Sequence, residues 1–301
     1  MKVDLHSHSS CSDGTYSPSQ LLLLAKEASI DVFALTDHDT LAGLQEARAQ
    51  AHALGIHLIN GVEISCHHQV GAGYGKQQVC DKVIHVVALG FDKVDVLQSK
   101  LQALQNSRAY RGRQMVDNLH QPLAQHNKTC DEVWQLVLKK VNDNPRAVGR
   151  AHIAQVLADI GVVKSIQESF DKYLADGKMA YVAIDALSME QTIALIHACG
   201  GLAVLAHPTR YGLSATKIRR LIGDFACFGG DALELPNNEP VSTRAMIDRC
   251  VKQYGLMVSV GSDFHGTNMP WRKLGQVAVP ALGQVGVWQR LLNEHGSTPP
   301  Y

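Results

Sequence analysis

Residues that bind divalent metals recur along this 301-residue chain at the places where short apolar runs end. Side chains at the ends of neighbouring strands gather at one edge of a sheet or barrel. Several such endings at one edge would build a site for more than one metal ion. Nine residues are candidate metal ligands: His6, His8, Asp13, His38, Glu63, His85, His207, Asp263 and His265.

The first ligands lie close to the N-terminus. His6 and His8 are two residues apart in an extended run, so both imidazoles face the same side of the strand. Asp13 and Gly14 follow in a turn-like stretch that can fold back over the same pocket. These three ligands can therefore meet without help from distant segments.

The other ligands belong to separate apolar runs. His38 follows 32–36, Glu63 follows 58–62, His85 lies within 83–87, His207 follows 202–206, and Asp263 and His265 follow 256–260. Imidazole and carboxylate donors together suit manganese, iron or zinc. The set holds no pair of cysteines, which argues against a closed structural zinc site.

Each motif alone has a plainer explanation. A single His-x-His is more often a partly exposed pair than a ligand set, and Asp37-His38-Asp39 is also typical of a turn. His85 alone would be a core histidine. Endings of the same kind on several predicted strands are difficult to explain in this way, so the sequence predicts one shared metal centre.

Taken in order, the motifs resemble those of the polymerase and histidinol phosphatase (PHP) family over almost the whole chain. They are His6-Ser7-His8, Thr36-Asp37-His38-Asp39, Gly61-Val62-Glu63, His85, Ala206-His207-Pro208 and Gly261-Ser262-Asp263-Phe264-His265. Residues 150–154, 173–178 and 207–211 resemble one branch of the family. That branch includes exoribonucleases of the RNase AM type and nucleoside 3′,5′-bisphosphate phosphatases.

The resemblance implies an α/β fold, a distorted (β/α)7 barrel with metals at its C-terminal face. The pattern of the chain agrees with alternating strands and helices. Helices are expected at 18–28, 44–54, 189–199, 216–228 and 242–254, and strands at 202–206 and 232–235. We expect residues 1–93 and 186–301 to form the barrel, and 94–185 to form a mostly helical insertion that caps its C-terminal rim.

The resemblance also implies three divalent metal ions, with Mn²⁺ favoured and Fe²⁺ or Zn²⁺ as alternatives. His6, His8, Glu63 and Asp263 would hold the first, and Glu63 would bridge to a second held by His85 and His207. Asp13, His38 and His265 would hold the third, although some family members have histidine in place of Asp13. Asp37 and Asp39 are expected to orient ligand imidazoles.

Phosphoryl transfer is the chemistry that such a centre suits, because clustered cations acidify water and neutralise phosphate oxygens. We expect His6, His8, Glu63 and Asp263 to take part in catalysis. The general acid is left open between His152 and the metals themselves.

The insertion and the nearby loops should select the substrate. Arginine suits terminal phosphates and tyrosine can stack on bases. The predicted substrate contacts are Arg111, Arg150, His152, Lys178, Arg210 and Tyr211. Arg108 and Arg113 are expected on a solvated face instead, and the glycine-rich residues 67–76 in a flexible surface loop.

Composition limits the partners. The 28 basic and 28 acidic residues cancel, so no overall positive field attracts long nucleic acid. Seven scattered cysteines argue against a disulfide framework. The N-terminus shows no signal peptide, and the most apolar stretch, 193–206, is too short to span a bilayer. A cytoplasmic protein, with a monomer favoured, is expected.

With these observations, the resemblance implies a metal-dependent 5′–3′ exoribonuclease on short, single-stranded, 5′-monophosphorylated RNA that also hydrolyses nucleoside 3′,5′-bisphosphates. A helical cap should exclude duplex. Two alternatives stay open: a small-molecule phosphatase of the histidinol-phosphatase type, and a non-catalytic metal-dependent binding module.

Overall fold

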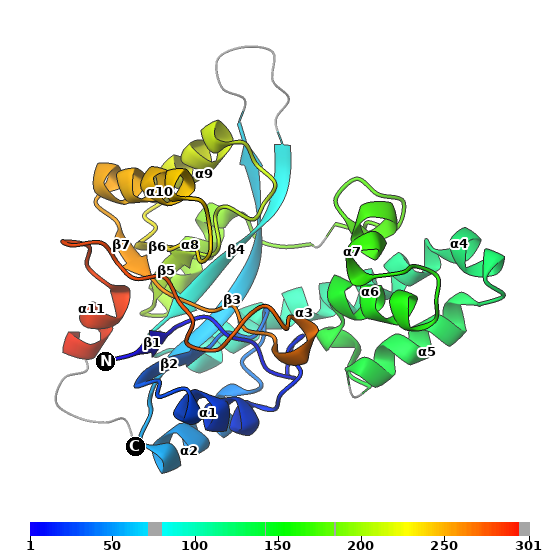
Figure 1. Cartoon of the computed structure of the whole chain (residues 1–301), viewed down its shortest axis with the longest axis horizontal. Coiled ribbons are helices and arrows are strands. Elements are labelled where there is room, and N and C mark those ends of the chain that lie inside the picture. Colours follow the sequence, from blue (N-terminus) through cyan, green and yellow to red (C-terminus); the bar gives the residue numbers. More distant parts are fainter. Residues whose placement is uncertain (72–79, 142, 184, 295–301) are drawn as a thin grey trace.

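A curled sheet of seven strands, ordered β1 to β7 as in the sequence, forms the body of the protein (Figure 1). The computed structural model describes residues 1–71, 80–141, 143–183 and 185–294. The strands are β1 (Val3–Asp4), β2 (Val32–Leu35), β3 (His57–Val70), β4 (Cys80–Leu89), β5 (Leu202–Leu205), β6 (Ala232–Glu234) and β7 (Met257–Ser259). Neighbours are parallel except at β4, which runs antiparallel to β3 and β5. The predicted α/β fold is confirmed.

The two edges of the sheet meet just beyond β1 and β7. Backbone hydrogen bonds run from Leu5 N to Val260 O (2.9 Å), from Asp263 N to His6 O (2.8 Å) and from His8 N to Phe264 O (2.9 Å). The joined segments carry candidate ligands from both ends of the chain. This seam therefore brings residues more than 250 positions apart into one place.

β3 and β4 form a hairpin whose strands are longer than the apolar runs 58–62 and 83–87. His67 pairs with Val83 and His68 with Lys82, so the strand continues to a fully buried Val70. The expected surface loop at 67–76 is thus wrong for 67–70, because alternate side chains on this stretch still enter the core. Residues 72–79 lie outside the described part of the chain.

Helices cover the outer face of the sheet. They are α1 (Pro18–Glu27), α2 (Leu44–Leu54), α8 (Met189–Ala198), α9 (Ala215–Cys227), α10 (Val241–Tyr254) and α11 (Val287–Glu294). Ser17 and Gln20 form a capping box at the start of α1. Within the described residues, no helix combines the length and apolar character needed to cross a membrane. The cellular location and the monomeric state stay predictions.

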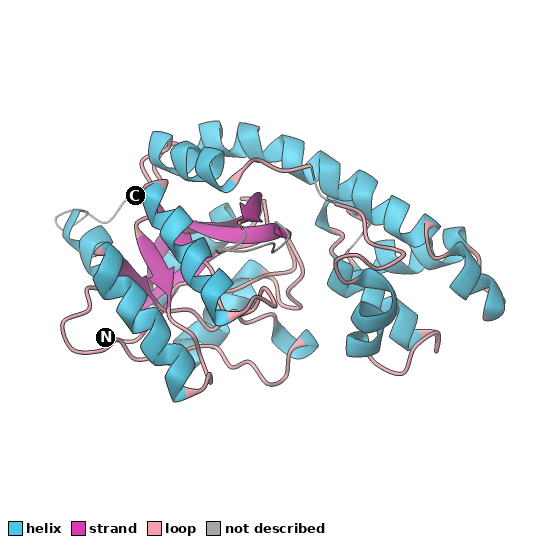
Figure 2. Cartoon of the chain, turned by 90° about the horizontal axis from the view of Figure 1, so that it is seen from above, coloured by secondary structure: helices cyan, strands magenta, loops and turns pink. Residues whose placement is uncertain are grey.

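The long helix α3 (Val94–Asp117) connects the sheet to a second group of helices (Figure 2). That group holds α4 (His120–Gln125), α5 (Cys130–Lys140), η1 (Pro145–Ala147), α6 (Arg150–Asp159), α7 (Ile166–Ser169) and η2 (Phe170–Leu174). Leu97 and Leu101 pack in the main core, whereas Met115 and Val116 pack in a separate cluster with the cap helices. The helix thus enters both cores. The division of the chain into a barrel (1–93 and 186–301) and an insertion (94–185) stays a prediction.

Polar contacts also tie the cap to the sheet. Arg108 Nε lies 2.5 Å from Asp39 Oδ2, and its Nη2 donates to Ser65 Oγ at 2.8 Å. The expectation of a solvated Arg108 is wrong, because this face of α3 lies against the sheet. Arg113 does lie on a partly exposed face, where it pairs with acidic residues of the cap.

Candidate metal centre

All nine predicted ligands converge in one place, where Glu63 and His85 lie within β3 and β4 and the other ligands follow or flank shorter strands, and they form four overlapping groups. In each group the potential ligand atoms lie within 4.8 Å of one another. The groups are His8, Asp13, His38 and His265; His6, His8 and Asp263; His6, Glu63 and His207; and His38, Glu63 and His85. Because the groups share members, they form one continuous cluster.

Glu63 occupies the middle of this cluster. Its Oε1 lies 3.0 Å from His85 Nδ1 and 2.9 Å from His207 Nε2. Its Oε2 lies 2.9 Å from His38 Nδ1 and 3.3 Å from His8 Nε2. The β3–β4 pairing explains part of this, since Glu63 and His85 are diagonal neighbours on one face of the hairpin. Oε2 also lies 3.4 Å from His6 Nε2, so the two carboxylate oxygens face different sets of imidazoles.

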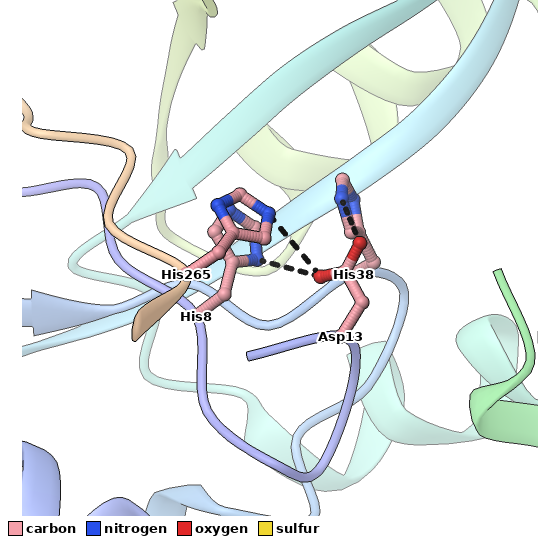
Figure 3. Close-up of side chains that lie close together, drawn as sticks. All are labelled: His8, Asp13, His38 and His265. Carbon is pink, nitrogen blue, oxygen red and sulfur yellow. Dashed lines mark ion pairs between the residues drawn. The ribbon is translucent and has the colours of Figure 1, made fainter. Parts of the chain in front are cut away.

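Asp13 draws three imidazoles together on the side of the cluster nearest the N-terminal loop (Figure 3). Its Oδ1 lies 3.3 Å from His265 Nε2 and 3.8 Å from His8 Nδ1, and its Oδ2 lies 3.7 Å from His38 Nε2. Sequence analysis placed His8 with His6 and Glu63 instead. The geometry puts His8 between both sets.

Asp263 completes the cluster from the seam. Its Oδ1 lies 3.3 Å from His8 Nε2 and 3.5 Å from His6 Nε2. Its other oxygen accepts a hydrogen bond from Arg210 Nη1. One oxygen thus faces the imidazoles while the guanidinium holds the other.

The donors fit divalent cations because several buried ring nitrogens and carboxylate oxygens make no well-aligned hydrogen bond within the described residues, although some of them lie close to one another. These atoms are His8 Nδ1, Asp13 Oδ1, His38 Nδ1, Glu63 Oε2, His85 Nδ1 and His207 Nδ1. A buried polar atom without a partner is costly. Cations among them would use these lone pairs, so the cluster is suited to hold divalent metal ions.

Backbone strain accompanies the cluster. Three non-glycine residues at the site have positive φ: Asp39 (53°), His207 (28°) and Asp263 (52°). Such conformations cost about 1–3 kcal/mol each and persist only where surrounding structure enforces them. Here they let the chain turn sharply where a strand ends, so that ligands point inward.

Two glycines allow the close approach of backbone at the site. A Cβ at Gly261 would lie 2.2 Å from His6 Cβ, and one at Gly14 would lie 2.1 Å from His8 O. Neither position has space for a side chain. The glycines in the motifs therefore permit the seam and the N-terminal turn to pack against the His6–His8 segment.

The cluster keeps its carboxylates ionised. Burial acts to raise the pKa of Glu63, but His38, His85 and His6 hold that pKa well below its usual value. Asp263 behaves in the same way, since His265 and His6 lower its pKa despite burial. In the metal-free centre the ionised carboxylates are therefore balanced by neighbouring imidazoles, and a bound cation can take the place of the protons on those imidazoles.

The histidines divide into charged and neutral ones. Burial opposes charge on His265, but Asp13 and Asp263 raise its pKa to about 9. Burial, together with His265 and His38, lowers the pKa of His8 to about 3. Cations that bind to the cluster must therefore displace a proton from His265 but none from His8.

Glu234 is the residue that sequence analysis missed. Its Oε2 lies 2.5 Å from His6 Nδ1, and both side chains are buried. This contact turns His6 Nε2 toward the cluster and fixes the ring, as outer carboxylates do for metal-bound histidines. A signal existed, because Glu234 is an acidic residue at the end of an apolar strand.

Asp37 and Asp39 have a different role from the predicted one. Asp37 accepts hydrogen bonds from Ser9 N (2.7 Å) and Ser12 Oγ (2.6 Å), which holds the loop that carries Asp13. Asp39 accepts from Ser65 N at 2.6 Å and contacts Arg108. In the described structure their hydrogen bonds go to these groups and not to ligand imidazoles, so the expectation that they orient the imidazoles is wrong.

Predicted substrate residues of the cap lie in two settings. Arg111 is buried, its Nε donates to Val182 O at 2.6 Å, and burial with Arg150 and Arg108 lowers its pKa to about 10. His152 is also buried, and its Nδ1 accepts from Gly149 N at 3.0 Å. Lys178 is exposed.

Arg150 lies between the two parts of the molecule. Its guanidinium lies 5.8 Å from the Tyr181 ring centre, and its Nη1 lies 3.1 Å from Asp176, which also binds Lys82 of β4 at 3.0 Å. The contact through Asp176 holds this arginine at the junction of cap and sheet.

The two predicted substrate contacts that lie outside the insertion, Arg210 and Tyr211, contact metal ligands or the segments that carry them. Arg210 binds Asp263, as described above. Tyr211 Oη donates to Ala206 O and accepts from His85 N, both at 2.9 Å. These two residues hold ligand-bearing segments in place.

Known proteins resemble this chain over nearly its full length. The family described as the PHP domain matches residues 4–198. A 5′-3′ exoribonuclease of Haemophilus influenzae is 36% identical over 295 residues, which covers 96% of this chain and 98% of that protein. A 3′,5′-nucleoside bisphosphate phosphatase of Chromobacterium violaceum is 35% identical over 275 residues, or 91% of this chain and 90% of that protein. A solved structure assigned as a metal-dependent phosphoesterase, from Bifidobacterium adolescentis, has a TM-score of 0.76 and 26% identity, and covers 97% of this chain and 95% of that one.

Proposed function

The chain belongs to the PHP domain family, and we propose that it hydrolyses phosphate esters of nucleotides with divalent metal ions. It acts as a 5′–3′ exoribonuclease on short 5′-monophosphorylated RNA and as a nucleoside 3′,5′-bisphosphate phosphatase. The convergence of nine donors carries this proposal, together with the buried His152, which lies near Asp13 across Gly149. The names of the Haemophilus and Chromobacterium relatives support it.

Both activities break the same bond. In each substrate a nucleoside carries a 5′-phosphate and a phosphorus on its 3′ oxygen. Water attacks that phosphorus, the P–O3′ bond breaks, and a proton passes to O3′. The product is a nucleoside 5′-monophosphate, together with inorganic phosphate or a shortened RNA with a new 5′-phosphate.

The metal ligands are those that the sequence predicts. We propose three ions per chain, with Mn²⁺ favoured, among His6, His8, Asp13, His38, Glu63, His85, His207, Asp263 and His265. Bound cations there supply acidified water and neutralise the phosphoryl oxygens. Glu63 supports this assignment, because its two oxygens face different imidazoles and can serve two ions.

His152 is the donor nearest the leaving group in this scheme. Its Nδ1 accepts a backbone hydrogen, so a neutral ring carries its proton on Nε2. Burial lowers its pKa, which keeps the ring neutral near pH 7. We propose that Nε2–H donates a hydrogen bond to O3′.

Arg111 and Arg150 bind the 5′-phosphate. Burial and the charge of Arg150 both disfavour the charged form of Arg111, and a bound anion would stabilise the two guanidiniums together. Lys178 lies on the same part of the chain and can add a solvent-exposed contact. Arg210 and Tyr211 contact the segments that carry the metal ligands, so they would meet the substrate on the side that faces the metals.

A substrate panel tests the proposal. RNA dinucleotides with a 5′-monophosphate should be cut far faster than those with a 5′-hydroxyl or 5′-triphosphate, and nucleoside 3′,5′-bisphosphates should lose their 3′-phosphate. Arg111→Ala should raise KM for 5′-monophosphate substrates about ten- to a hundredfold, while the matched control Arg113→Ala should not.

Two outcomes would contradict it. Equal rates on all three 5′ ends would remove the 5′-phosphate pocket. Metal binding without hydrolysis of any phosphate ester, a generic aryl phosphate included, would make the protein a binding module.

A further inference from the structure

The segment 266–274, which follows the ligand His265, forms a lip beside the metal centre. It is held to the loop that carries Asp13, since Thr267 N donates to Thr15 Oγ1 (3.0 Å) and Asn268 Nδ2 donates to Asp13 O (3.2 Å). The sequence analysis gave this lip no role.

Arg272 anchors the far end of the lip to the site. Its Nη1 donates to Ser262 O at 3.2 Å, directly before the ligand Asp263. Its Nε is buried and lacks a hydrogen-bond partner among the residues that the structure describes. Burial lowers the pKa of Arg272 and the nearby Arg210 lowers it further. A guanidinium with an unused donor, whose charge adds to that of Arg210, favours an anion at this place.

Trp271 precedes this anchored arginine and is 67% exposed. The other two tryptophans are better covered, since Trp134 packs against the cap core and Trp288 is only 8% exposed. A large indole exposed on the segment that follows a metal ligand offers a flat surface on which a base can stack.

The cap and the Arg272 end of the lip approach the cluster at different ligands. The cap reaches it near Asp13, where a Cβ on Gly149 would lie 3.9 Å from Asp13 Oδ2. Arg272 approaches from the side of Asp263 and Arg210. A substrate held at its 5′ end by the cap therefore extends across the cluster toward the lip.

We propose that the lip binds the nucleotide that follows the scissile phosphate, with Trp271 stacked on its base and Arg272 on the next phosphate. The occupant is single-stranded oligonucleotide, because an unpaired base is needed for stacking. This inference rests on the proposed exoribonuclease activity. A nucleoside 3′,5′-bisphosphate has no such nucleotide, so it does not reach the lip.

The comparison of two substrates tests this role. Trp271→Ala should raise KM for a 5′-phosphorylated RNA dinucleotide about tenfold or more, and leave KM and kcat for a nucleoside 3′,5′-bisphosphate within about twofold. Trp271→Phe should retain most of the dinucleotide activity, because phenylalanine also stacks. Arg272→Ala should weaken binding of a trinucleotide more than of a dinucleotide.

Fluorescence gives a direct readout. A phosphorothioate-linked, 5′-phosphorylated trinucleotide, added with Mn²⁺, should quench tryptophan emission of the wild type and of Trp134→Phe. Trp271→Phe should bind the same trinucleotide with little quenching.

The inference would be overturned by equal losses on both substrates in Trp271→Ala, by unchanged dinucleotide kinetics, or by quenching that survives Trp271→Phe. If the wild type cleaved neither substrate, the proposed function would fail. The quenching titration would still decide whether the lip binds oligonucleotide.

Discussion

Removal of Glu234 tests whether a carboxylate outside the ligand set positions His6. Its Oε2 lies 2.5 Å from His6 Nδ1 in a buried setting. A hydrogen bond to a charged group contributes about 1.5–3 kcal/mol, and about 1.4 kcal/mol corresponds to a factor of ten. Loss of comparable outer partners weakens metal binding by about 10- to 100-fold, so the two estimates agree.

We expect Glu234→Ala to weaken metal binding near the upper end of this range, because the His6 ring is free to rotate. Glu234→Gln should cost about tenfold, since its amide oxygen still accepts from Nδ1–H. Mn²⁺ titration of the metal-free protein by calorimetry measures both, and kcat/KM at saturating Mn²⁺ should recover in Glu234→Gln.

The exposed Glu27→Gln provides the matched control, because it removes the same charge far from the cluster. If both Glu234 variants bound Mn²⁺ like the wild type, Glu234 would have no positioning role. The same conclusion would follow if Glu27→Gln weakened binding as much as Glu234→Gln did.

Three further predictions concern stability. Arg108→Ala leaves the buried Asp39 without its partner and should cost about 3–5 kcal/mol in urea unfolding; a loss below about 1 kcal/mol would contradict this account. In the metal-free protein, the pKa of His265 is raised from 6.5 to about 9, so its stabilisation is complete below pH 6.5 and disappears as pH rises through 9. Without metal, the free energy of unfolding in urea should therefore fall between pH 6.5 and 9. A free energy of unfolding that rose over this range would contradict the role given to His265. Gly261→Ala forces a Cβ against His6 and should destabilise the fold by about 1–3 kcal/mol and reduce bound Mn²⁺, as measured by thermal unfolding and metal analysis; wild-type values in both would contradict the close packing.

The ligands could be predicted from the sequence because each depends on a local pattern. His38, for example, follows a short apolar run, and the end of a buried strand can be recognised without knowledge of its neighbours. The start of the first helix at residue 18 and the alternation of strands and helices also follow from local patterns.

What the sequence could not predict depends on contacts between distant segments. Glu234 and His6 are 228 positions apart, and only the sheet order brings their strand ends together. Arg108 lies on a helix that serves two cores, so its surface pattern does not show which face the sheet covers. The sequence does not show that Asp37 binds the loop that carries Asp13, because that loop has no distinctive pattern.

Anomalous diffraction from crystals grown with Mn²⁺ tests the central claim most directly. The account predicts strong peaks enclosed by His6, His8, Asp13, His38, Glu63, His85, His207, Asp263 and His265, with ligand atoms at about 2.0–2.3 Å. Density for Mn²⁺ only elsewhere on the protein, or none in this cluster at saturating concentration, would contradict it.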